Sequence, residues 1–117
     1  MHEMSYIVRL VNQAMEQVEK KNPIHVNSVH IEVGEMTGLE PFYLLKYYPI
    51  AVKNTRLEGS KLEITEVPVE ALCHSCQTLF HPTKEFQYLC PHCGGGQATI
   101  RRGREFVLDH IAMEVND

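Results

Sequence analysis

Long apolar runs and basic residues are both scarce in this sequence of 117 residues. No run of apolar residues approaches the length needed to span a membrane, and no apolar secretory segment follows Met1. Lysine and arginine number 11 against 15 acidic residues, which gives a formal net charge of −4 at pH 7. Because non-specific affinity for phosphates comes from basic residues, this balance argues against nucleic acid as the main partner. We therefore expect a cytoplasmic protein without a membrane or nucleic-acid partner.

Signatures of catalysis are absent as well. The sequence contains no Ser-His-Asp order typical of a hydrolase and no glycine-rich loop that would hold a phosphate group. Hydrophobic residues make up 44% of the chain, a fraction typical of folded globular proteins. A length of 117 residues allows one ordinary domain, or a small domain with a metal-stabilised module. We expect a folded protein that is not an enzyme.

All four cysteines stand in two CxxC pairs separated by thirteen residues: Cys73, Cys76, Cys90 and Cys93. Two such pairs predict one tetrahedral zinc ion held by four thiolates. Four protein ligands leave no open coordination position, so the site is expected to be structural rather than catalytic. Zinc binding then stabilises the surrounding fold. The glycines at 94–96 are expected to supply the positive φ angles of a tight exit from the second pair.

Other interpretations of the cysteines have different requirements. Two disulfides would need an oxidising compartment. A thioredoxin-like CxxC would stand once, at the start of a helix. His74, His81 and His92 lie close to the cysteines in the sequence. We expect these histidines to be exposed to solvent; the alternative is that one of them replaces a cysteine ligand when pH or metal load changes.

The spacing of apolar residues predicts two helices and three strands. The first helix starts near Met4 and ends at Asn22-Pro23. Pro41 starts the second helix, with Glu40 near its cap, and Pro49 predicts a kink or a break in it. Alternating apolar residues predict strands at 25–33, 62–67 and 105–115. The apolar face of the first helix comprises Met4, Ile7, Val11, Ala14 and Val18.

These elements predict an α+β fold, with two helices packed on one face of a three-stranded, mostly antiparallel sheet and an inserted zinc-ribbon-like module. The predicted first domain comprises residues 1–69, completed by a C-terminal strand at 104–117, and the zinc-binding module comprises residues 70–103. The strands that lead into and out of the module are expected to pair with each other, antiparallel. An open sheet edge in so short a chain is compatible with a monomer or a homodimer.

The first three residues, Met1-His2-Glu3, form a second candidate metal site. A free α-amine, the amide nitrogen of His2 and its imidazole can chelate one metal through a five-membered and a six-membered ring. Nitrogen-rich planar geometry of this kind suits Ni(II) or Cu(II) rather than zinc or magnesium. The fourth position is open to a carboxylate, a water or another histidine. Glu3 is adjacent, and Glu40 could reach the site from the loop that ends at the second helix. The alternative is that a Met-His start occurs by chance and that the terminal residues fray.

Four segments occur together in this chain: Met1-His2-Glu3 before an amphipathic helix, Gly34–Pro41, Leu57-Glu58-Gly59 and the doubled CxxC. Through them the whole chain resembles the HypA/HybF hydrogenase nickel-incorporation proteins. The resemblance implies a metallochaperone that carries Ni(II) as cargo on its N-terminus and helps deliver it to the large subunit of nickel–iron hydrogenase. It also implies service to urease in some members.

The same resemblance implies which residues form each site. The family's nickel site corresponds to Met1, His2, Glu3 and Glu40, and its structural Zn(II) site corresponds to Cys73, Cys76, Cys90 and Cys93. The implied partners are a nickel-handling maturation GTPase, the hydrogenase large subunit and a urease accessory protein. Pro49 departs from what the family leads us to expect in the second helix.

A function of another class remains open, that of a zinc-ribbon module that binds nucleic acid or a protein partner. It rests on the CxxC pairs and on Arg101, Arg102 and Arg104, which follow the second pair. Salt-sensitive binding to DNA or RNA would favour it.

Overall fold

The computed structural model describes residues 2–116, and the chain divides into two compact units. Unit 1 comprises Met1–Glu32, Gly38–Thr65 and Val107–Asp117, and unit 2 comprises Val33–Thr37 and Glu66–Phe106. None of the helices within residues 2–116 is long and apolar enough to cross a membrane.

Helix α1, Glu3–Lys21, covers the core of unit 1 with one apolar face. Its sequence places Ile7, Leu10, Val11, Ala14 and Val18 on that face, and all five are buried. The predicted face is therefore confirmed except at Met4, which is 39% exposed. The helix ends where Asn22 adopts a left-handed φ of 46° and donates its N–H to the carbonyl of Val18 at 2.8 Å.

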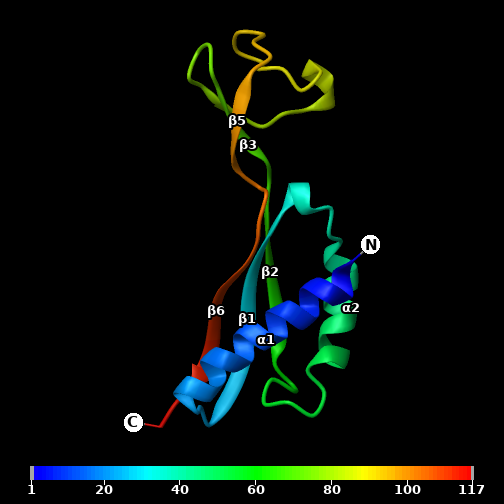
Figure 1. Ribbon diagram of the computed structural model, residues 1–117, viewed down its shortest axis with the longest axis vertical. Coiled ribbons are helices and arrows are strands. Elements are labelled where there is room, and N and C mark those ends of the chain that lie inside the picture. The colour runs from blue at the N-terminus through cyan, green and yellow to red at the C-terminus, as the bar shows by residue number, and fades with distance from the viewer. Residues whose placement is uncertain (1, 117) are drawn as a thin grey trace. The chain divides into compact units, whose positions relative to one another are not determined.

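The sheet of unit 1 has the strand order β2-β1-β6. These strands are β1 (His25–Gly34), β2 (Lys61–Val67) and β6 (Phe106–Glu114). The N–H of Ile24 donates to the carbonyl of Glu114 at 2.7 Å, so the start of β1 meets the end of β6 and the two run antiparallel. Strands β1 and β2 run in the same direction and are joined through a helix, as parallel neighbours require (Figure 1).

The expected pairing between the two strands that flank the zinc segment is wrong, because β2 and β6 each pair with β1 instead. The physical reason lies in β1. Its side chains at Val29, Ile31 and Val33 are buried at alternate positions, which gives β1 the most continuous apolar face of the three strands. A strand with such a face is best buried at the centre, with a neighbour on each side.

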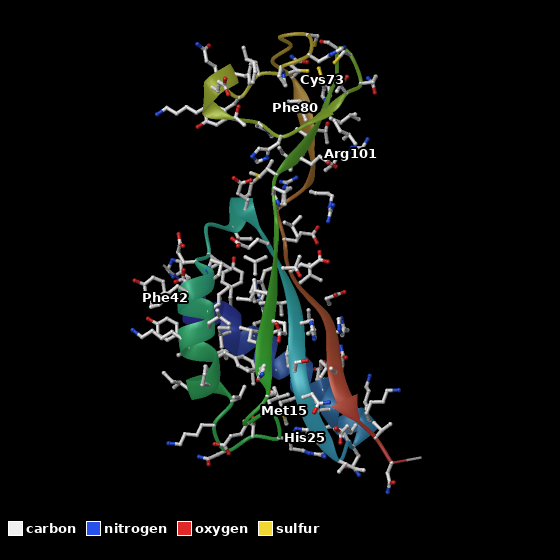
Figure 2. The ribbon with its side chains drawn as sticks, turned by 180° about the vertical axis from the view of Figure 1, so that it is seen from behind. Met15, His25, Phe42, Cys73, Phe80 and Arg101 are labelled. Carbon is white, nitrogen blue, oxygen red and sulfur yellow. The ribbon has the colours of Figure 1, made fainter. Side chains whose placement is uncertain are left out.

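Helix α2, Pro41–Ala51, lies on the same face of the sheet as α1, with the opposite face uncovered (Figures 1 and 2). Leu44 and Tyr48 are its buried residues, and the Tyr48 hydroxyl lies 2.7 Å from Oγ of Ser60. The helix continues through Pro49 to Ala51, so a break at this proline is excluded. Pro49 stands in the last turn, where its missing N–H costs one intrahelical bond. The predicted α+β architecture is confirmed.

Unit 2 contains a second, small antiparallel sheet with the strand order β4-β3-β5. Its strands are β3 (Glu70–Cys73), β4 (Leu79–Phe80) and β5 (Ala98–Arg102), with Ala71 opposite Phe80 and Cys73 opposite Ala98. Two short 3-10 helices, Glu35–Thr37 and Lys84–Phe86, complete the unit. The buried residues of its core cluster are Ala71, Cys73, Phe80 and Cys90. Two of these four are cysteines, so little apolar core remains without them.

Two glycines in unit 2 allow three chain segments to pass at backbone contact distance. A Cβ atom on Gly34 would lie 2.3 Å from the carbonyl oxygen of Gly103. A Cβ atom on Gly103, whose φ is +97°, would lie 2.6 Å from Cα of Val69. The carboxylate of Glu35 accepts a hydrogen bond from the N–H of Val69 at 2.9 Å and joins two of these segments. Larger residues at 34 and 103 would push the backbone apart.

Candidate metal centres

The structure brings all four cysteines of unit 2 together. Their Sγ atoms lie within 4.8 Å of one another, with Cys73 3.5 Å from Cys93 and Cys76 3.7 Å from Cys90. A tetrahedral ion with metal–sulfur bonds of about 2.3 Å separates its ligands by about 3.8 Å, so the set fits such an ion. A disulfide requires about 2.05 Å. All four thiols are free, and the alternative of two disulfides is therefore wrong.

The two CxxC pairs form equivalent turns. The N–H of Gln77 donates to the carbonyl of Cys73 at 3.0 Å, and the N–H of Gly94 donates to the carbonyl of Cys90 at 2.8 Å. Both residues directly follow a pair, and both have a positive φ, 61° at Gln77 and 78° at Gly94. Each turn therefore directs its two sulfurs to one side. Only the second turn carries the glycine that this conformation favours.

Gly95 serves the cluster by its size rather than by its φ. Among the glycines at 94–96, only Gly94 has a positive φ, so the expectation for the other two is wrong. A Cβ atom on Gly95 would lie 3.1 Å from Oγ of Ser75 and 3.3 Å from Sγ of Cys93. The N–H of Gly95 lies 3.4 Å from the Cys93 sulfur, in position to donate to it. A side chain at this position would therefore be crowded against the cluster, which favours glycine here.

The thiols differ in acidity in a way that also favours a bound cation. A hydrogen bond from the Thr78 side chain lowers the pKa of Cys76 to about 6. The amide of Gly95 lowers the pKa of Cys93, but the neighbouring Cys73 and Cys76 thiols outweigh it and raise that pKa to about 12. The cluster therefore resists carrying four negative charges by itself. A divalent cation at its centre would offset the repulsion between thiolates.

The nearby histidines do not join this group. His74, His81 and His92 are exposed, as expected, and each lies outside the four-residue set. The imidazole of His74 lies 2.7 Å from Oγ1 of Thr99, and that of His81 lies 2.7 Å from the carbonyl of Val69. Arg101 and Arg102, at the end of β5, are exposed as well (Figure 2).

A second candidate site lies in unit 1, where the N-terminal ends of α1 and α2 meet. The N–H of Glu40, the residue before α2, donates to Oε2 of Glu3 at 3.2 Å. Glu3 is only 5% exposed, whereas the side chains of His2 and Glu40 are open to solvent. Met1 lies outside the described residues. A hollow of about 600 Å³ at this point is lined by His2, Glu3, Met4, Ser5, Glu40, Tyr43 and Tyr47.

The structure thus brings His2, Glu3 and Glu40 to one hollow. Within residues 2–116, however, the cysteine cluster is the one group with three or more His, Cys, Asp or Glu ligand atoms gathered closely enough for a metal. Side chains alone therefore do not complete a metal site in the hollow. Any ion bound there would need backbone nitrogen ligands as well.

Two aromatic residues of the hollow were not singled out by sequence reasoning. Tyr43 and Tyr47 line it, and their rings stack with centroids 6.1 Å apart. They stand three and seven positions after Glu40, a helical spacing that places all three on one side of α2. That spacing was the available signal. The spacing does not stand out in the sequence, because α2 carries apolar residues on several sides. Phe42 and Leu45, for example, are exposed as well (Figure 2).

Comparisons with known proteins agree with one another. Residues 1–113 match the family model described as hydrogenase/urease nickel incorporation, metallochaperone, hypA. The hydrogenase maturation factor HypA of Caldanaerobacter subterraneus subsp. tengcongensis is 35% identical, over 97% of this chain and 100% of that protein. The guanidine hydrolase-activating protein A of Synechocystis sp. is 40% identical, over 82% of this chain and 78% of that protein.

Solved structures share the fold. The nickel metallochaperone HypA from Helicobacter pylori gives a TM-score of 0.70 at 21% identity, over 99% of this chain and 100% of that chain. A second HypA structure gives a TM-score of 0.72 at 22% identity, over 97% and 96% of the two chains. The predicted resemblance is confirmed by the family match. The chain belongs to the HypA family of hydrogenase and urease nickel-incorporation metallochaperones.

Proposed function

We propose that this chain binds one Ni(II) ion at its amino terminus and delivers it to the large subunit of nickel–iron hydrogenase. The α-amine of Met1, the amide nitrogen of His2 and the His2 imidazole would supply three nitrogens in one plane. Such a donor set suits Ni(II) better than zinc or magnesium. The observation that carries the proposal is the hollow shared by His2 and Glu40, whose two segments are joined by the Glu3 carboxylate.

The two carboxylates would have different roles at this site. Glu3 is almost fully buried and accepts the N–H of Glu40, so its side chain would hold the two segments together. Glu40 is exposed beside the same hollow, and its carboxylate would be available for the fourth coordination position. The four candidate ligands, Met1, His2, Glu3 and Glu40, are then divided between cargo binding and support.

Exposure of the terminal site suits a carrier. Its ligands must lose protons before they bind metal, so nickel would be released as the local pH falls or as a partner offers better ligands. The four cysteines are suited to the opposite task. We assign them a structural Zn(II) ion, because four thiolates close the coordination sphere and leave no position for exchange. Zinc would supply folding energy to unit 2, and the cargo would stay in unit 1.

The partners would follow from this delivery role. We infer contact with a nickel-handling maturation GTPase and with the hydrogenase large subunit in the cytoplasm, and with a urease accessory protein where urease is served. A second candidate recipient comes from the Synechocystis relative, which is named as an activator of guanidine hydrolase and is 40% identical to this chain. Delivery of metal to a guanidine hydrolase is therefore a specific alternative.

Gene disruption in the source organism distinguishes these recipients. Hydrogenase, urease and guanidine hydrolase activities would be measured with and without the gene, at low and at high nickel. We expect hydrogenase activity to fall at low nickel and to recover at high nickel, because excess metal bypasses a carrier. Loss of guanidine hydrolase activity alone would identify the alternative recipient. Full retention of all three activities would contradict a delivery role.

Nickel binding is tested by His2→Ala beside His25→Ala. His25 is an exposed histidine at the start of β1 in the same unit, so it is a matched control. We expect His2→Ala to abolish binding of one nickel per chain in calorimetry, and His25→Ala to leave it unchanged. Equal affinity in both variants would show that the cargo binds elsewhere.

A further inference from the structure

Two histidines from neighbouring strands of unit 1 lie ring against ring. The imidazoles of His30 on β1 and His110 on β6 are stacked, with centroids 4.1 Å apart and an angle of 14° between the ring planes. His30 stands between the buried residues Val29 and Ile31, so its side chain leaves the opposite face of β1. That face of the sheet carries no helix (Figure 2). A dissolved ion therefore reaches the pair without any opening of the core.

Each ring of the pair has one nitrogen held by a polar neighbour. Nδ1 of His110 lies 3.1 Å from Oδ2 of Asp109. An ionised carboxylate only accepts hydrogen bonds, so Nδ1 carries the proton and Nε2 of the neutral ring keeps the lone pair. Nε2 of His30 lies 2.8 Å from Oγ of Ser28, and when it donates to that oxygen, Nδ1 keeps the lone pair. Histidines that ligate metals are commonly oriented by a carboxylate in this way.

We propose that these two imidazoles bind a late first-row divalent ion such as Ni(II) or Cu(II), with water in the remaining coordination positions. Imidazole suits these ions, whereas magnesium and calcium prefer oxygen ligands. His30 and His110 are not among the residues that line the terminal hollow, so the pair is a separate site. It does not depend on nickel binding at the amino terminus. Two protein ligands leave the ion open to exchange, which suits collection of metal rather than a structural role.

The separation of the rings matches a shared ion. An ion with metal–nitrogen bonds of about 2.1 Å places adjacent ligand nitrogens about 3 Å apart and opposite ones about 4.2 Å apart. The ring centroids are 4.1 Å apart, within that span. Because parallel rings direct their nitrogens along parallel lines, the rings must rotate about their Cβ–Cγ bonds to converge on one ion. The side chain of His110 is 57% exposed, so it has room for this rotation.

Acidic side chains around the pair favour a cation. The carboxylate of Asp109 contacts the ring of His110 directly. Glu32 follows His30 by two positions on β1, so it leaves the same face of the sheet. The lysines at 20–21 line one groove with Asp109 and His110 and oppose a cation there. We therefore expect binding that is weaker than at the amino terminus and reversible.

Nickel titration of the zinc-loaded, untagged full chain, followed by NMR of the imidazole nitrogens, tests the proposal. Planar four-coordinate nickel is diamagnetic, whereas nickel held by two imidazoles and water is six-coordinate and paramagnetic. Beyond the first equivalent, nickel should broaden the ring signals of His30 and His110 selectively. The exposed His25, also on β1, is the internal control and should stay sharp. Sharp signals from the pair in a large excess of nickel, or equal broadening at His25, would overturn the proposal.

Three variants separate this site from the terminal one. His110→Gln removes one ligand at an exposed position and should abolish the broadening at His30. Asp109→Asn removes the charge that supports His110 and should weaken nickel binding by the pair about tenfold. His2→Ala should remove the diamagnetic first step and keep the broadening of the pair, so each site can fail without the other. Broadening at His30 that persists unchanged in His110→Gln would overturn the proposal.

Discussion

The carboxylate of Glu3 accepts a hydrogen bond from the backbone N–H of Glu40 at 3.2 Å, although 37 positions separate the two residues. Glu40 immediately precedes α2, so the first turn of α1 is joined to the start of α2. A negative charge at the amino end of a helix is favourable because the helix dipole is positive there. This contact keeps His2 and Glu40 beside one hollow.

Replacing Glu3 tests this contact. We predict that Glu3→Ala lowers the melting temperature and weakens nickel binding, because the two segments lose their connection. Glu3→Gln keeps an oxygen that can accept the Glu40 N–H, so it should lower the melting temperature and the nickel affinity less than Glu3→Ala does. Thermal unfolding and nickel calorimetry provide the two measurements. Equal nickel affinity in Glu3→Ala and the unchanged chain would show that the contact does not organise the site.

Pro49 offers a gain in stability. Replacing it with alanine restores an N–H that can bond to the carbonyl of Leu45, and it removes a ring that crowds that carbonyl. Proline in a helix interior costs about 3 kcal/mol relative to alanine. Because Pro49 is in the last turn of α2 and exposed, we predict that Pro49→Ala raises the free energy of unfolding by about 1–2 kcal/mol. Urea denaturation measures this change, and a loss of stability would contradict the prediction.

The two CxxC turns allow a paired test. Gln77 holds a φ of 61° that glycine adopts without strain, so Gln77→Gly should tighten zinc binding by about fivefold, equivalent to about 1 kcal/mol. Gly94→Ala is the opposite change at the equivalent position, where φ is 78°, and should weaken binding by a similar factor. Competition with a chromophoric chelator gives both values. The account fails if the two variants shift affinity in the same direction.

Removing zinc should unfold unit 2 and spare the helices of unit 1. The core cluster of unit 2 is Ala71, Cys73, Phe80 and Cys90, so two of its four buried residues belong to the four-cysteine group that could hold a metal. Acid should have the same effect as a chelator, because protons displace zinc from thiolates as the pH falls. We predict that the amide chemical shifts of β3 and β5 move to random-coil values while the helical circular dichroism persists. Simultaneous loss of both signals would show that the units do not fold separately.

Much of unit 1 could be predicted from the sequence. The 3.6-residue spacing of apolar side chains and the Asn22-Pro23 pair defined α1, and alternation at Val29, Ile31 and Val33 defined the core of β1. The order of the strands could not be predicted, because it depends on the pairing of segments that lie far apart in the sequence. The expected pair of β2 and β6 was plausible from chain connectivity alone, yet β1 separates them.

In unit 2 the grouping of the cysteines was predictable from the sequence, but the strands were not. The spacing of the cysteines predicted their convergence. Strand β4 is only two residues long, Leu79–Phe80, and a segment this short carries no period that a sequence pattern could reveal. The stack of His30 on His110, with ring centroids 4.1 Å apart, was equally out of reach because it depends on the register of two distant strands.

Nickel titration of the untagged chain with an intact Met1, beside a copy with two additional residues before Met1, tests the central claim most directly. Calorimetry would give stoichiometry, and visible absorbance would report the coordination geometry. The account predicts that the native chain binds one nickel with a planar d–d band and that the extended copy does not, because the extension removes the α-amine from its place beside His2. Equal binding by both chains would contradict an amino-terminal cargo site.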